Sequence, residues 1–113
     1  MLLAAVAAAL AASGLWALAQ PQERVVRIAA RKFVYLPQEV TLKKGVPVVL
    51  EFTAEDVVMG FSAPDFDVRA DIIPGKIARV RLVPDKVGTF AFLCDIFCGS
   101  GHETMSGTIT VVA

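Results

Sequence analysis

The chain has 113 residues, and its eleven Lys and Arg side chains are balanced by eleven Asp and Glu, so the formal net charge is zero. A chain of this length supports a single domain around one modest core. The balanced charge argues against a nucleic-acid partner, because binding to nucleic acid requires a basic surface.

Residues 1–19 are apolar and carry no charge. They end in Ala17-Leu18-Ala19, a small-x-small pattern that a signal peptidase could cut, which favours an export signal over an uncleaved membrane anchor. No Lys or Arg precedes the apolar run, so neither form has the usual orientation signal. Residues 20–24 are expected to form a polar linker. Both interpretations place a domain over 25–113 outside the cytoplasm, in the periplasm or on the outer face of the membrane.

Short β runs broken by Pro and Gly follow the linker. The spacing of roughly seven strands, with no credible helix after residue 20, predicts an all-β sandwich. The expected runs cover 25–29, 33–35, 40–42, 46–53, 68–73, 76–82, 89–93 and 107–112.

The chemically informative segment lies between the last two of these runs. It reads C-D-I-F-C-G-S-G-H-E-T-M and holds the two cysteines and the single histidine of the chain, Cys94, Cys98 and His102, followed by Met105. Two thiolates, an imidazole and a thioether in one loop select copper, for which a weak thioether is a common ligand. Because Cys94 leaves one strand and Met105 enters the next, both ends of the loop are expected to be held by a sheet.

The same residues are compatible with simpler roles. The two cysteines could form a disulfide, as pairs in exported proteins usually do, although a loop this short gains little from closure. Zinc would accept the thiolates and the imidazole but takes thioether poorly. Met105 could be an ordinary core side chain.

These residues resemble those of the CuA domain of cytochrome c oxidase subunit II, which also occurs in nitrous oxide reductase. The similarity rests on D-V-V-M-G-F at 56–61, I-P-G at 73–75 and the run from 94 to 109, with weaker similarity farther upstream. It implies a cupredoxin-like Greek-key β-sandwich with two copper ions bridged by Cys94 and Cys98. His102 would be a terminal ligand and Met105 a weak one, while Ile96 would contribute its backbone carbonyl.

The chain departs from this family at Met59, where the second terminal histidine is expected. A thioether donates less strongly than imidazole towards Cu(II), so Met59 as a ligand should favour the reduced state and raise the reduction potential. Met59 could instead be an apolar filler over an empty or mononuclear Cu(I) site, or the second chain of a dimer could complete the ligands. Phe61 and Phe97 are expected to shield the site from water or, equally, to be ordinary core aromatics.

Three functions therefore stay open. Electron transfer would pair the chain with a c-type cytochrome or an oxidase subunit, and copper storage or delivery would pair it with a copper donor or acceptor. The third is a metal-free accessory module held by a disulfide. We expect no catalytic residues, because no open coordination position adjoins a general base, and we expect Asp95 and Glu103 to be solvated loop charges.

Overall fold

The computed structural model describes residues 23–97, 99 and 105–113. Within these residues the chain forms nine strands and one short 3-10 helix. In chain order they are β1 (Arg24–Arg31), β2 (Val34–Leu36), β3 (Glu39–Lys43), β4 (Val48–Ala54), β5 (Met59–Ala63), η1 (Pro64–Phe66), β6 (Val68–Ile72), β7 (Ala78–Leu82), β8 (Gly88–Leu93) and β9 (Ser106–Val112).

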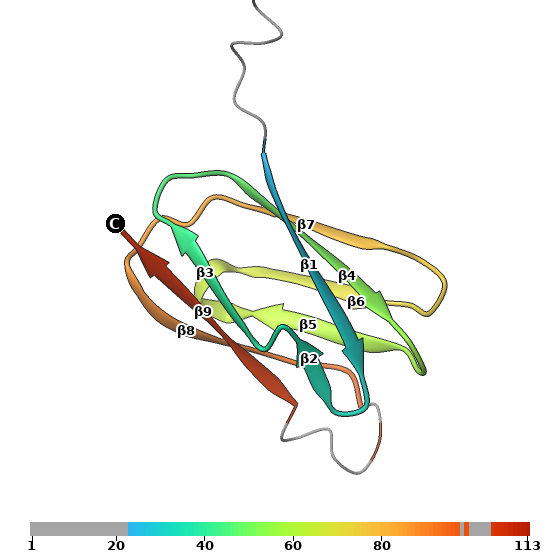
Figure 1. Ribbon diagram of the computed structural model, residues 1–113. Helices are drawn as coiled ribbons and strands as arrows, with labels where there is room; N and C mark the ends of the chain where they lie inside the picture. Colours follow the sequence, from blue (N-terminus) through green and yellow to red (C-terminus); the bar gives the residue numbers. More distant parts are fainter. Residues whose placement is uncertain (1–22, 98, 100–104) are drawn as a thin grey trace, which may run out of the picture.

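The strands form two sheets packed face to face, as Figure 1 shows. The four-stranded sheet has the order β2-β1-β4-β7, and the five-stranded sheet has the order β3-β9-β8-β5-β6. β1 runs parallel to β4 and β3 runs parallel to β9, while the remaining neighbours are antiparallel. The predicted all-β, cupredoxin-like sandwich is therefore confirmed.

Alternating side chains from both sheets fill the space between them. In β4, for example, Leu50 and Phe52 are fully buried, whereas the intervening Glu51 faces outward, as a period of two requires. Four buried rings form a row in which Phe52 packs on Phe61, Phe61 on Phe92 and Phe92 on Tyr35, with centroids 4.4–5.5 Å apart. Aromatic contacts of this kind stabilise a core beyond the area that they bury, and here they join the two sheets near the end of β8.

The sequence pattern missed two local features. Residues 59–63 form a strand that the pattern did not predict, and Pro64–Phe66 form a 3-10 turn where no helix was expected. Four of the five residues of β5 are buried, so the strand shows no polar–apolar alternation. A strand covered on both sides gives no period-two signal.

The described residues contain no helix that is both long enough and apolar enough to cross a membrane. The apolar segment 1–19 lies outside the described residues, as does most of the 20–24 linker. The signal or anchor expected there stays a prediction.

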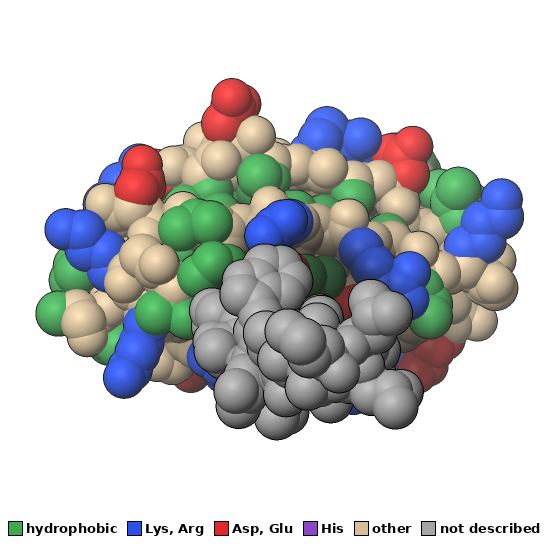
Figure 2. Space-filling model, turned by 90° about the horizontal axis from the view of Figure 1, so that it is seen from above, with side chains coloured by type: hydrophobic (Ala, Val, Ile, Leu, Met, Phe, Trp, Pro, Cys, Tyr) green, Lys and Arg blue, Asp and Glu red, His purple; other side chains and the backbone are tan. Residues whose placement is uncertain are grey.

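Charged side chains of both signs are interspersed over the end of the sandwich where β1 begins, as Figure 2 shows. On the outer face of the four-stranded sheet, Glu51 forms ion pairs with Arg27 and Arg79, with N–O distances of 3.4 and 3.0 Å. Exposed pairs of this kind contribute little to stability.

Candidate metal centre

At the opposite end of the sandwich, the last two strands end in the paired residues Cys94 and Met105, which we call the neck. β8 and β9 pair up to Leu93 and Ser106, and the Cys94 N–H then donates to the Met105 carbonyl at 3.2 Å. Both side chains at this neck are buried, with Cys94 3% and Met105 1% exposed. The two residues therefore hold the ends of the loop between them, as the sequence predicted.

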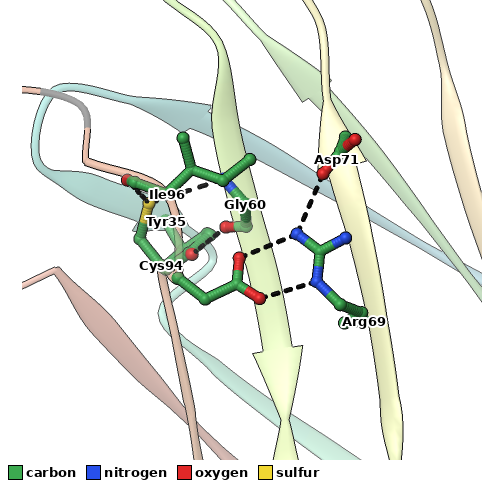
Figure 3. A network of polar contacts seen from close by, with 7 residues as sticks. Tyr35, Gly60, Arg69, Asp71, Cys94 and Ile96 are labelled. Carbon is green, nitrogen blue, oxygen red and sulfur yellow. Dashed lines mark hydrogen bonds and ion pairs between the residues drawn. The ribbon is translucent and has the colours of Figure 1, made fainter.

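The Cys94 sulfur has a donor on one side and an acceptor on the other. The Gly60 N–H donates to Sγ at 3.4 Å, and the thiol donates to the Ile96 carbonyl at 3.1 Å, as drawn in Figure 3. The carbonyl expected to be a ligand thus faces the same small volume as the sulfur. Loss of the thiol proton would leave both as donor atoms for a metal, and the Gly60 N–H would still offset the negative charge on sulfur.

Met59 begins β5 and is fully buried. β5 and β8 are antiparallel with Ser62 opposite Leu93, so continuing that register places Met59 opposite Ile96. Its side chain belongs to the same core cluster as Cys94 and Met105. Burial at this register position is compatible with a ligand and with a filler, so both interpretations of Met59 remain predictions.

Two of the predicted ligands, Cys98 and His102, lie outside the described residues. Over 23–97, 99 and 105–113 no three His, Cys, Asp or Glu side chains gather as a metal site. The candidate donors that the structure does bring to one end of the five-stranded sheet are the Cys94 thiol, the Ile96 carbonyl and the two buried thioethers. A sulfur-rich donor set of this kind fits copper better than a hard cation.

Gly60 is a contact point that the sequence did not single out. Besides donating to Cys94, it accepts a 2.7 Å hydrogen bond from the buried Tyr35 hydroxyl of the other sheet. A Cβ atom at this position would overlap the Asp95 carboxylate. Gly60 therefore allows the segment after Cys94 to lie directly against β5.

Asp95 is an exposed loop charge, as expected, but it is ion-paired as well. Arg69 of β6 donates to both of its oxygens, with Nε–Oδ2 at 2.7 Å and Nη2–Oδ1 at 2.9 Å. Nη2 also donates to Asp71 at 2.9 Å, and these bonds, first to Asp95 and then to Asp71, raise the pKa of Arg69 above its ordinary value. Glu103 lies outside the described residues.

The two aromatic residues expected to shield the site differ. Phe61 is fully buried and packs on Phe92, whereas Phe97 is 75% exposed and is not part of the described core. Shielding of the metal site by either ring stays a prediction, because Cys98 and His102 lie outside the described residues.

Comparison with known proteins identifies the family. A model of the cupredoxin-like domain matches residues 1–111, and the chain belongs to this family. It is similar to cytochrome c oxidase subunit 2 of Thermus thermophilus, with 31% identity over 91 residues that cover 80% of this chain and 67% of that one. A second subunit 2 from this species matches at the same identity, but only 54% of its length is spanned.

Solved structures agree with the fold. The periplasmic domain of subunit II of cytochrome oxidase from Bradyrhizobium japonicum superimposes with a TM-score of 0.74 at 21% identity, covering 81% of this chain and 86% of that one. A copper binding protein in its apo form superimposes with a TM-score of 0.65 at 26% identity, covering 82% of this chain and 93% of that one.

Proposed function

We propose that this cupredoxin-like domain transfers electrons through a copper–thiolate centre. The observation that carries the proposal is the convergence of the Gly60 N–H, the Cys94 sulfur and the Ile96 carbonyl within one small, partly buried volume. Similarity to cytochrome c oxidase subunit 2 of Thermus thermophilus supports it. Cys94, Cys98, His102 and Met105 would bind the metal together with the Ile96 carbonyl, and Met59 is the candidate for a further ligand.

Bound copper would supply one-electron exchange. The surrounding fold would hold the copper ligands in nearly the same positions in both oxidation states of the metal. Cys94 is fixed by its backbone bond to Met105 and by the Gly60 N–H, so little rearrangement accompanies a change of charge. Burial of Cys94 and Met105 excludes water, which favours the less charged, reduced state.

We place the domain outside the cytoplasm, facing a redox partner such as a c-type cytochrome or an oxidase subunit. Support comes from the export-like segment 1–19 and from the likeness to a periplasmic oxidase domain. The chain itself would be an electron carrier, and the catalytic chemistry would belong to the partner complex.

Copper storage or delivery is the second candidate. It is favoured by the fully buried thioether of Met59 at the register position opposite Ile96, where the related family has an imidazole. Thioether sulfur prefers Cu(I), which a carrier would hold without cycling its charge. The likeness to a copper binding protein is in line with this alternative.

Copper content and spectra of the purified protein separate these functions. Two copper ions per chain with an electron paramagnetic resonance spectrum in which both nuclei couple to one electron would support electron transfer. One tightly bound, spectroscopically silent copper would support storage or delivery. A protein that takes up no copper after reduction and anaerobic loading, and that forms a Cys94–Cys98 disulfide in air, would contradict both and leave the metal-free module.

A further inference from the structure

A second feature of the neck lies on the opposite face of the sheet from the copper donors. Arg69 in β6 and Asp95 after β8 are separated by β5, since the sheet order is β8-β5-β6. Their side chains nevertheless meet through two hydrogen bonds, because Gly60 has no side chain between them. Figure 3 shows the Arg69 guanidinium on the β6 side of β5, with two dashed contacts running from it across β5 and a third to Asp71.

We propose that Arg69 is a positioning residue for the copper loop, acting through Asp95. This inference rests on the proposed copper site but concerns residues that would not touch the metal. Asp95 stands between Cys94 and Ile96, the two residues whose sulfur and carbonyl face each other at 3.1 Å. A carboxylate fixed on the outer face fixes the backbone that directs both neighbours.

The geometry of the pair supports a positioning role. The fork of an arginine matches the two oxygens of a carboxylate and constrains their plane, which a single point charge does not do. The remaining Nη2 contact to Asp71 holds the guanidinium itself on β6. Asp71 is the register partner of Gly60, so the whole contact is a row across three neighbouring strands.

The need for such a contact follows from where the ladder ends. β5 and β8 share the pair Ser62–Leu93, but the Gly60 N–H is used by the Cys94 sulfur. Among the described contacts on the β5 side, those that hold residues 94–96 include the Gly60 bond to the Cys94 sulfur and the Arg69–Asp95 pair. The Arg69 and Asp95 side chains are 48% and 26% exposed, and a pair this exposed adds little to global stability. Its effect should fall on local geometry.

The test compares Arg69→Gln and Arg69→Lys with Arg79→Gln. Arg79 forms an ion pair of similar length with Glu51 on the other sheet and is therefore the matched control. The first readout is amide hydrogen exchange at Asp95 and Ile96 in the copper-free protein, with the denaturation midpoint as a check on global stability. The second is the copper dissociation constant together with the electron paramagnetic resonance parameters.

We expect Arg69→Gln to speed exchange at Asp95 and Ile96 several-fold, with little change in midpoint, and to weaken copper binding by about tenfold. Arg69→Lys, which keeps the charge and loses the fork, should lie between wild type and Arg69→Gln. Arg79→Gln should match wild type. Equal exchange and equal affinity in Arg69→Gln and Arg79→Gln would overturn the proposal, as would full retention by Arg69→Lys.

The two proposals fail in different ways. If the wild-type protein bound no copper, the proposed function would fail, but exchange at Asp95 and Ile96 would still decide whether Arg69 orders this segment. If copper bound normally in every variant and exchange did not change, only the role of Arg69 would be lost.

Discussion

The two sheets of this domain contribute differently to the candidate site. The described donors all belong to the five-stranded sheet: Met59 begins β5, Cys94 follows β8 and Met105 precedes β9. The four-stranded sheet supplies nine of the 20 buried core residues, and one of its contacts with the site segment is the Tyr35 hydroxyl on Gly60. The five-stranded sheet thus carries the candidate ligands, while the four-stranded sheet packs against it and stabilises it.

The ion pairs of the two sheets make the same contrast. Glu51 binds Arg27 and Arg79 on an ordinary outer face, whereas Asp95 binds Arg69 beside the residues that would hold copper. The ion pairs have similar lengths, so the effect of removing each one depends on whether its residues lie beside the candidate copper ligands. Changes confined to one sheet can therefore separate copper binding from folding.

The largest effect is expected from Cys94→Ser in the five-stranded sheet. Loss of the thiolate should abolish stable copper loading, while the unfolding free energy falls by only about 1 kcal/mol, typical of a single buried substitution. Elemental analysis and urea denaturation of the same sample measure the two effects. Stoichiometric copper in the variant would exclude Cys94 as a ligand.

Phe52→Ala in the four-stranded sheet should give the opposite result. Its ring is fully buried and packs 4.4 Å from Phe61, centroid to centroid, and loss of such a ring costs about 3–5 kcal/mol. Urea denaturation should show this loss, while copper per folded chain stays at the wild-type value. If copper were lost at temperatures where the variant is folded, the division between the sheets would be wrong.

Met59 can be tested by two substitutions. If its thioether is a ligand, Met59→His should lower the reduction potential, because imidazole favours Cu(II); a tenfold shift in relative affinity corresponds to about 59 mV for a one-electron couple. Met59→Leu keeps the apolar volume and is the matched control. A Met59→Leu protein with wild-type potential and affinity would make Met59 a filler.

A smaller loss of stability than that of Phe52→Ala is expected from Tyr35→Phe, which removes the 2.7 Å bond to the Gly60 carbonyl but keeps the ring. Leaving a buried acceptor without its donor costs about 1–3 kcal/mol. Calorimetry should show a modest fall in unfolding temperature, with copper stoichiometry unchanged. A fall as large as that of Phe52→Ala would mean that the hydroxyl does more than tie the two sheets together.

The sequence was sufficient for the fold class and for most strands, because alternation in runs such as 76–82 reports one buried and one wet face, as β7 shows. It also placed Cys94 and Met105 correctly at the two ends of a loop. It missed β5, whose side chains are mostly buried and do not alternate. It could not foresee that Arg69 binds Asp95, since only the sheet order brings these residues, 26 positions apart, to either side of Gly60.

The direction of β1 sets where the domain can be tethered. β1 enters at the end of the sandwich opposite to the Cys94–Met105 neck, as Figure 1 shows, and its eight residues span about 26 Å at 3.3 Å per residue. A linker or anchor that precedes Arg24 would therefore attach to the end of the domain far from the candidate metal site. The Cys94–Met105 end of the domain would then stay accessible to a redox partner.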